Sequence, residues 1–249
     1  MTAEERNLTD EDIEELAGDE ATSVSYAVRL IDVSRVYDLG TRKIAALQNV
    51  NLSVKAGEFV VVHGPSGSGK TTLLNLIGAI DAATSGRVLL MDVPINDYDE
   101  SFKATFRLTN TGFIFQSYNL VSTLTAAENV MFPMQLAEQP IEKTREEASR
   151  LLAKVGIADR EDHLPWQLSS GEQQRVAFAR AMANDPPIIL ADEPTANLDS
   201  ESAGLIRHLL DELSGRGKTI IVMTHDEKII GRLGSTLYTM KGGAVEAIV

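Results

Sequence analysis

The chain of 249 residues carries the octapeptide Gly64-Pro65-Ser66-Gly67-Ser68-Gly69-Lys70-Thr71 between two patterned segments. Residues 58–63 before it read Glu-Phe-Val-Val-Val-His, which is typical of a buried strand, and residues 71–80 after it have the spacing of a helix. A strand, a glycine-rich loop and a helix in this order match the pattern G-x-x-x-x-G-K-[ST], a loop that binds nucleotide phosphates. The alternative, a chance turn rich in glycine and serine, is disfavoured by this context.

The chemistry of this loop predicts a site for a nucleoside triphosphate. Its glycines allow backbone N–H groups to turn inward around phosphate oxygens, and the helix that begins near Gly69 adds the positive end of its dipole. We expect Lys70 to reach the β- and γ-phosphates and the Thr71 hydroxyl to bind Mg²⁺. We expect Thr72 and the rest of the octapeptide to complete the nucleotide contacts, but the loop alone leaves the class of protein open.

A second segment predicts the acidic half of the site. Residues 188–193 read Ile-Ile-Leu-Ala-Asp-Glu, an apolar strand that ends in two acids. The strand places Asp192 at its carboxyl end, the edge where parallel α/β sheets bind ligands. We expect Asp192 to hold magnesium, directly or through water, and Glu193 to polarise the attacking water as general base. A solvated acidic turn before Pro194 is the alternative, and the phosphate loop in the same chain disfavours it.

The order of patterned segments predicts an α/β fold with a parallel sheet, because strands are followed by helices at both ends of the chain. Strand patterns occur at residues 27–33, 50–54, 58–63, 87–91, 112–115, 188–191 and 219–223. Helical patterns occur at residues 71–80, 140–155, 171–183 and 200–213, and a capping-box pattern begins at Thr125. Residues 123 to about 184 are mostly helical by period, so we interpret the stretch of about 117–184 as a helical insertion in a domain of residues 25–249.

Residues 1–24 have a different composition from the rest. The first 25 residues contain nine acidic residues and one arginine, within a net charge of −13 for the whole chain. This composition predicts a flexible, solvated tail. The alternative is a docking or regulatory helix, because residues 7–16 have an amphipathic pattern with Thr9 or Asp10 as its cap.

Composition also excludes several classes of site and partner. The chain has no cysteine, which excludes disulfides and thiolate metal sites. Its acidity argues against nucleic-acid binding, which needs clustered lysine and arginine. No apolar run approaches the roughly 18 residues of a membrane span, and the acidic start does not fit a signal peptide. We therefore expect another protein to provide any attachment to a membrane.

Between the two predicted halves of the site, residues 168–175 read Leu-Ser-Ser-Gly-Glu-Gln-Gln-Arg. This segment resembles the signature of the ABC ATPases, usually Leu-Ser-Gly-Gly-Gln followed by Gln-Arg, and Ser169 precedes Asp192 by the 23 residues that the family shows. The resemblance extends from about residue 27 to 243. It implies a RecA-like phosphate-loop core with an antiparallel β subdomain and an inserted α-helical subdomain, and it implies ATP as the ligand.

The resemblance assigns further roles. Tyr37 matches the aromatic residue that stacks on adenine, and Gln116 matches the glutamine that approaches magnesium and the attacking water. Asp199, in residues 196–199 (Ala-Asn-Leu-Asp), matches the acid of the D-loop. His225, in residues 222–226 (Val-Met-Thr-His-Asp), matches the histidine that contacts the γ-phosphate.

The resemblance also implies a homodimer. Ser169 and the backbone N–H of Gly171 begin a helix, so they offer donors and a positive dipole to phosphate, and in the family these donors serve the ATP held by the other subunit. This chain departs from the usual signature at two positions, with Ser170 in place of glycine and Glu172 in place of glutamine. A β-carbon at Ser170 would crowd the opposing phosphate if the backbone there had positive φ, which puts the rate of hydrolysis in doubt.

Several segments resemble one branch of the family, the macrolide-efflux, lipoprotein-release and cell-division ATPases, namely residues 112–116, 119–120, 123–126, 128–130, 192–195 and 197–199. The branch implies an ATP-hydrolysing subunit of a membrane transporter or mechanotransmission complex at the cytoplasmic face of the membrane. Its partner would be an integral membrane protein with few spanning helices and a large extracytoplasmic domain. One alternative is an ATP-switched regulator of a membrane-bound signalling or cell-wall protein. Another is a soluble ABC ATPase acting on DNA or ribosomes, although such relatives usually carry coiled-coil arms, zinc modules or two cassettes.

Overall fold

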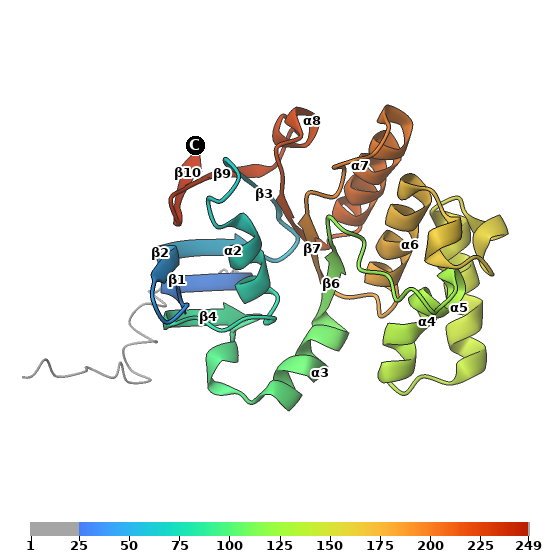
Figure 1. The fold of residues 1–249 in the computed structure, drawn as a ribbon, viewed down its shortest axis with the longest axis horizontal. Coiled ribbons are helices and arrows are strands. Elements are labelled where there is room, and N and C mark those ends of the chain that lie inside the picture. The colour runs from blue at the N-terminus through green and yellow to red at the C-terminus, as the bar shows by residue number, and fades with distance from the viewer. Residues whose placement is uncertain (1–24, 249) are drawn as a thin grey trace, which may run out of the picture.

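The computed structural model describes residues 25–248, which form two sheets with helices around them (Figure 1). The larger sheet has six strands in the order β10-β9-β3-β8-β7-β6. Its neighbours from β9 to β6 pair in parallel, and only β10 pairs antiparallel, with β9. The strands are β3 (Phe59–His63), β6 (Thr111–Ile114), β7 (Ile188–Asp192), β8 (Thr219–Met223), β9 (Thr236–Lys241) and β10 (Ala244–Ile248). The predicted parallel α/β sheet is therefore confirmed.

The smaller sheet is antiparallel and has the order β2-β1-β4-β5. Its strands are β1 (Tyr26–Asp38), β2 (Lys43–Lys55), β4 (Ser85–Leu90) and β5 (Val93–Pro94). It lies beside α2 (Lys70–Ile77), the helix that follows the phosphate loop (Figure 1). This sheet is the antiparallel part of the predicted fold.

Most of the remaining helices lie between β6 and β8 along the chain. They are α4 (Ala126–Leu136), α5 (Ile141–Lys154), α6 (Ser170–Met182) and α7 (Ser200–Gly215), with short 3-10 turns η2 (Ala158–Arg160) and η3 (Pro165–Gln167). The first three lie inside the stretch 117–184 that the sequence predicts as a helical insertion, whose boundaries stay a prediction. The predicted capping box at Thr125 is present, because Thr125 and Glu128 each accept from the other's backbone N–H.

The structure also contains elements that the sequence patterns did not predict. These are η1 (Ile95–Asp97), α3 (Glu100–Asn110), α8 (Glu227–Ile230) and the hairpin of β9 and β10. Among the described residues, no helix has both the length and the apolar character needed to cross a membrane. The acidic tail of residues 1–24 lies outside the described residues.

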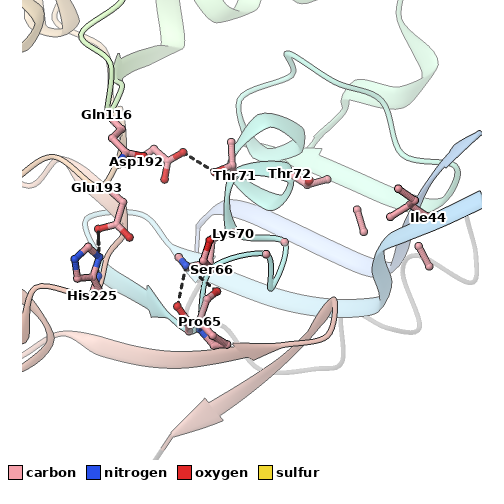
Figure 2. Close-up of a pocket in the computed structure, with 15 residues that line it drawn as sticks. Ile44, Pro65, Ser66, Lys70, Thr71, Thr72, Gln116, Asp192, Glu193 and His225 are labelled. Carbon is pink, nitrogen blue, oxygen red and sulfur yellow. Dashed lines mark hydrogen bonds and ion pairs between the residues drawn. The ribbon is translucent and has the colours of Figure 1, made fainter. Parts of the chain in front are cut away.

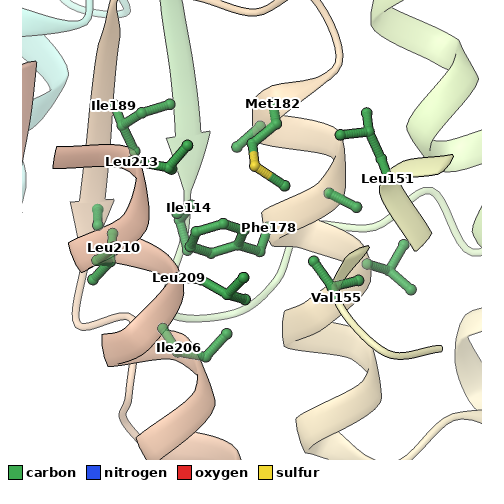
Figure 3. Packing of buried hydrophobic residues seen from close by; sticks show 14 of the residues in the cluster. Ile114, Leu151, Val155, Phe178, Met182, Ile189, Ile206, Leu209, Leu210 and Leu213 are labelled. Carbon is green, nitrogen blue, oxygen red and sulfur yellow. The ribbon is translucent and has the colours of Figure 1, made fainter. Parts of the chain in front are cut away.

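The larger, six-stranded sheet separates two apolar cores, because successive side chains of a strand point to opposite faces of the sheet. Phe59 and Val61 of β3 enter the core shared with α4 to α7, whereas Val60 and Val62 enter the core shared with α2 and the smaller sheet. Figure 3 shows Phe178 of α6, which is fully buried, beside Leu209 of α7. Truncating such a phenylalanine costs about 3–5 kcal/mol, so this core holds α6 and α7 against the sheet that carries the site.

Candidate functional site

The phosphate loop connects β3 to α2, and its glycines are required by close approaches of the backbone. A β-carbon at Gly64 would collide with the carbonyl oxygen of Met240. Gly69 caps α2 with φ 107°, and a β-carbon there would lie 2.5 Å from the carbonyl oxygen of Ala46. These contacts explain why the chain needs glycine at both positions, and they hold the loop in the shape that presents the start of α2 to a ligand.

Lys70 lies across this loop. Its Nζ donates to the carbonyl oxygens of Gly64 at 2.8 Å and Pro65 at 3.2 Å, so the ammonium is held at the loop (Figure 2). The hydroxyl oxygen of Ser68 is buried inside the loop and has no hydrogen-bond partner among the described residues. A cation and the N-terminus of a helix at one loop form a site for phosphate.

The loop opens on a cavity of about 610 Å³, a size suited to a nucleotide. The cavity brings together most of the predicted site residues from four separate parts of the chain: Gly64, Pro65, Ser66, Gly67, Gly69, Lys70, Thr71, Thr72, Gln116, Asp192, Glu193 and His225. Gln116, Asp192 and His225 follow or end β6, β7 and β8, so they meet at the carboxyl edge of the parallel sheet. Ile44, Ala45 and Ala46 of β2 also line the cavity, and the sequence patterns did not single them out.

Thr71 and Asp192 form the pair of hard oxygen groups at this site. The Thr71 hydroxyl donates to Oδ2 of Asp192 at 2.7 Å, and Asp192 is only 8% exposed (Figure 2). Burial raises the pKa of Asp192, and the hydrogen bond from Thr71 opposes that rise. Within residues 25–248, no group of three or more acidic, histidine or cysteine side chains is arranged to hold a metal. The pair fits Mg²⁺, which usually takes one or two protein oxygens and completes its shell with substrate phosphates and water.

Glu193 directly follows β7 and is held in one orientation. Its backbone has φ 46°, and its N–H donates to the carbonyl oxygen of Met223. Its Oε2 lies 2.9 Å from Nδ1 of His225 and accepts from the Thr224 hydroxyl and the His225 N–H, each at 3.2 Å (Figure 2). A left-handed backbone at a residue other than glycine persists only when its surroundings enforce it, and here the end of β8 does so.

The signature segment begins α6, and its first residues form a capping box. Ser169 Oγ accepts from the Glu172 N–H, and Glu172 Oε2 accepts from the Ser169 N–H. Arg160 donates to the other oxygen of Glu172 at 2.9 Å. Chiefly through this bond, the pKa of Glu172 falls to about 2. Both carboxylate oxygens of Glu172 therefore already have hydrogen-bond partners in its own chain, at Ser169 and Arg160.

The structure shows the backbone conformation of Ser170 and the packing of Gly171 at the start of α6. Ser170 is the first residue of α6 and is absent from the residues with positive φ, so the condition under which its β-carbon would crowd a phosphate is not met. Gly171 packs so closely on Ser202 that a β-carbon there would collide with the Ser202 hydroxyl. Asp199 caps α7 beside it, and the N–H and hydroxyl of Ser202 lower the pKa of Asp199. The signature and the D-loop therefore abut within one chain.

Seven of the predicted site residues do not line the cavity. They are Ser68, which is buried inside the loop, Tyr37, and the five residues Ser169, Ser170, Gly171, Glu172 and Asp199. The Tyr37 hydroxyl donates to Asp81 at 2.7 Å, and the Arg35 guanidinium lies 4.5 Å from the Tyr37 ring centre. Its cross-strand partner Ile44 lines the cavity instead. Adenine stacking on Tyr37 stays a prediction.

Comparisons with known proteins show the family of the chain. The profile of the family described as ABC transporter matches residues 47–196. The uncharacterized ABC transporter ATP-binding protein MJ0796 of Methanocaldococcus jannaschii is 45% identical over 224 residues, which cover 88% of this chain and 95% of that protein. The macrolide export ATP-binding/permease protein MacB of Hyphomonas neptunium is 46% identical over 205 residues, covering 82% of this chain and 32% of that protein. This chain therefore spans about a third of the length of that exporter.

A solved structure of similar shape is the dimeric, post-hydrolysis state of the ATP-binding cassette MJ0796 bound to ADP and Pi. It matches with a TM-score of 0.84 and 44% identity, over 88% of this chain and 96% of that one. The predicted RecA-like fold is confirmed by this likeness. Because the family profile spans more than half of the sequence and these relatives extend along most of it, the chain belongs to the ABC transporter family and is one of its ATP-binding, ATP-hydrolysing subunits.

Proposed function

We propose that two copies of this chain pair head to tail around two ATP molecules, each held by the phosphate loop of one copy and the signature helix of the other. The observation that carries the proposal is that, within one chain, the signature helix lies outside the cavity that the phosphate loop lines. Lys70, Thr71 and Glu193 line the cavity, whereas Ser169 is exposed at the start of α6 and does not line it. The N-terminus of α6 offers free N–H donors to an anion, and a second copy would bring them to the phosphate. The dimeric structures of MJ0796 support this arrangement.

Within each site, the residues at the sheet edge have different roles in binding and hydrolysing ATP. Lys70 binds the β- and γ-phosphates from the loop, where its ammonium is already held. Glu193 acts as general base, because its carboxylate lies in the cavity and is aimed by two donors, the Thr224 hydroxyl and the His225 N–H, with the His225 ring 2.9 Å away. His225 is 77% exposed, so its ring is free to contact the γ-phosphate on one side while it contacts Glu193 on the other.

Thr71 and Asp192 would hold Mg²⁺, with Gln116 contributing from the same cavity. When bound, the ion neutralises charge that develops on the phosphate oxygens. Thr71 would exchange its present bond to Asp192 for a bond to the metal. Gln116, which lines the same cavity as Glu193, would orient the attacking water.

Closure of the dimer is the step that does work. The γ-phosphate touches groups from both copies, so its binding energy favours the closed pair over the open one. Hydrolysis removes the link between Lys70 of one copy and Ser169 of the other. The pair then reopens, and the cycle moves whatever is attached to the helical part of each copy.

The attached partner is an integral membrane protein that docks in a groove between α3, β6 and α4. The groove has a volume of about 480 Å³, and its walls are largely apolar, including Ile80, Leu108, Phe113, Phe132 and Leu136. Phe115 and Asn119, which flank Gln116, also line it, so a partner in the groove lies next to the nucleotide site. Exposed apolar surface of this kind marks protein interaction sites. The chain would then work at the cytoplasmic face of the membrane.

The partner we favour has few spanning helices and a large extracytoplasmic domain, as the branch resemblance implies. The likeness to a macrolide export ATP-binding/permease protein supports this branch. The alternative, an ATP-switched regulator of a membrane-bound signalling or cell-wall protein, uses the same cycle and differs only in the partner. Sequencing of the membrane protein that co-purifies with the chain distinguishes the two.

Complementation of two inactive variants tests the head-to-tail pair directly. K70M removes the loop lysine and S169R blocks the signature, so each homodimer is inactive at both sites. A mixed dimer regains one intact site, and random pairing restores up to about a quarter of the parent rate. A mixture of K70M and T71V, both altered in the same half-site, serves as the control and stays inactive.

A second measurement follows the dimer itself. E193Q should form a dimer in ATP, seen by sedimentation, and should turn over little ATP. If the K70M and S169R mixture stays inactive while E193Q remains monomeric in saturating ATP, the proposed pairing is wrong.

A further inference from the structure

Arg180, in the last turn of α6, contacts the segment that follows Gln116. Its two terminal nitrogens donate to the carbonyl oxygens of Asn119 at 2.5 Å and Tyr118 at 2.7 Å. The charged guanidinium thus bonds the carbonyl oxygens of two consecutive residues. Hydrogen bonds from a charged donor are stronger than bonds between neutral groups. The two partners are 61 and 62 residues away in sequence, so the contact is purely tertiary.

The turn that Arg180 holds has an unusual backbone. Tyr118 has φ 59° and Asn119 has φ 49°, so two consecutive residues other than glycine adopt the left-handed conformation. Such residues are costly and persist only where contacts enforce them. Within the turn, the Asn119 N–H donates to the carbonyl oxygen of Ser117. Arg180 holds the turn from outside through its bonds to the two carbonyl oxygens. These bonds fix the position of the segment that follows Gln116, the residue that lines the cavity.

The charge of Arg180 is not neutralised by any carboxylate within residues 25–248. Burial alone lowers the pKa of its guanidinium to about 10, so the group is still charged at neutral pH. A partly buried charge without a counter-ion is unfavourable for stability on its own. Among the described residues, two carbonyl oxygens are the only hydrogen-bond partners of Arg180, which points to a role in placing those carbonyls.

Helix α6 joins this turn to the rest of the catalytic apparatus. Ser169 caps its first turn, about 16 Å from Arg180 along the axis of a regular helix. Between them, the buried amide of Gln174 donates to the carbonyl oxygen of Pro194, next to Glu193. One rigid helix therefore contacts the signature, the strand end that carries the general base, and the turn beyond Gln116.

We propose that Arg180 is a positioning residue that makes the Gln116 segment move as one body with the signature helix. The proposal rests on the head-to-tail function above and extends it. A shift of the turn at residues 118–119, which borders the groove assigned to the membrane partner, is carried by Arg180 to Ser169. In the other direction, engagement of Ser169 by the opposite nucleotide is carried back to Gln116. Arg180 contacts neither nucleotide in this scheme.

The test compares R180K and R180Q with a control, R150Q. Arg150 lies on α5, donates to Glu147 at 2.7 Å, and lines neither the cavity nor the groove. We expect R180Q to bind ATP within about threefold of the parent chain and to lose kcat by roughly 10- to 100-fold, because small misplacements of catalytic groups have effects of this size. R180K keeps the charge without the fork and should be intermediate, and R150Q should keep the parent kcat.

Amide hydrogen exchange and dimer formation separate positioning from simple destabilisation. In R180Q the amides of residues 117–120 should exchange faster, and in the E193Q background R180Q should need more ATP to dimerise than R150Q does. The inference is overturned if residues 117–120 loosen while kcat stays at the parent value. It is also overturned if ATP affinity, kcat and the melting temperature of R180Q and R180K all fall together. Neither result contradicts the head-to-tail proposal. That proposal is tested separately, by the K70M and S169R mixture and by the dimerisation of E193Q without further changes.

Discussion

Nδ1 of His225 lies 2.9 Å from Oε2 of Glu193, and the two residues follow neighbouring parallel strands, β8 and β7. The pairing of Asp192 with Met223 in that ladder fixes the distance between the strand ends. Glu193 is only 12% exposed at its side chain, whereas His225 is open to the cavity. In the proposed mechanism, this geometry would let His225 link Glu193 to the γ-phosphate of a bound nucleotide.

Replacing His225 with alanine should lower kcat by about 10²-fold or more, in the range that loss of a positioned acid–base group produces. ATP affinity should change little, because Lys70 and the loop are untouched. The measurement is steady-state hydrolysis together with nucleotide titration. H208A, at an exposed position on α7, is the control, and parent-like turnover by H225A would contradict the assignment.

The Thr71–Asp192 pair predicts how activity depends on magnesium. D192N should raise the magnesium concentration that gives half-maximal hydrolysis on the order of 10- to 100-fold, because loss of even an outer-shell partner weakens metal affinity by about that factor. Titration of activity with Mg²⁺ after EDTA treatment measures the shift. D185N serves as the matched control, since Asp185 pairs with Lys218 away from the cavity. An unshifted titration for D192N would show that the metal is held elsewhere.

The close packing of Gly171 on Ser202 predicts a compensating pair of substitutions. G171A introduces a β-carbon that collides with the Ser202 hydroxyl, and overpacking of this kind lowers the free energy of unfolding by about 1–3 kcal/mol. The double variant G171A/S202G removes the colliding side chain and should recover most of that loss. Urea unfolding of the two single variants and the double variant measures the coupling. Simple additivity of the two single changes would contradict the packing explanation.

The bond between Arg160 and Glu172 predicts a pH-dependent contribution to stability. The pKa of Glu172 is lowered from 4.5 to about 2, first of all by Arg160. A lowered carboxyl pKa stabilises the fold above the unfolded value, and this stabilisation disappears as pH falls from about 4.5 to about 2. R160Q should therefore be less stable than the parent at neutral pH, and the difference should shrink across that window.

Thermal unfolding of R160Q at a series of pH values measures this effect, with the same comparison in an E172Q background as the control. In that background the Glu172 carboxyl group is absent, so the pH dependence that Glu172 supplies should be lost, and any remaining difference should reflect the second ion pair of Arg160, with Asp159 at 2.8 Å. A difference between R160Q and the parent that stays constant down to pH 2 would rule out Glu172 as its source.

The phosphate loop and the acidic strand end could be predicted from the residues because their signals are local. Eight consecutive residues define the loop, and an apolar run that ends in Asp192 and Glu193 defines the second half-site. Several elements were missed although a signal was present. Asp99 caps α3, and Gly242-Gly243 forms the turn between β9 and β10, but α3 has only one buried apolar side chain, Phe106, and β9 is mostly half-buried. Weak burial leaves a weak periodic pattern.

The local chemistry of this protein was readable along the chain, namely a glycine loop suited to phosphate and two acids after a buried strand. Only the folded molecule decided which distant groups meet: Thr71 with Asp192, Glu193 with His225, and Arg180 with the turn after Gln116. The order β3-β8-β7-β6 brings these groups to one edge of the sheet. Strands buried on both faces are apolar throughout, so their sequences carry no mark of which neighbour each will pair with.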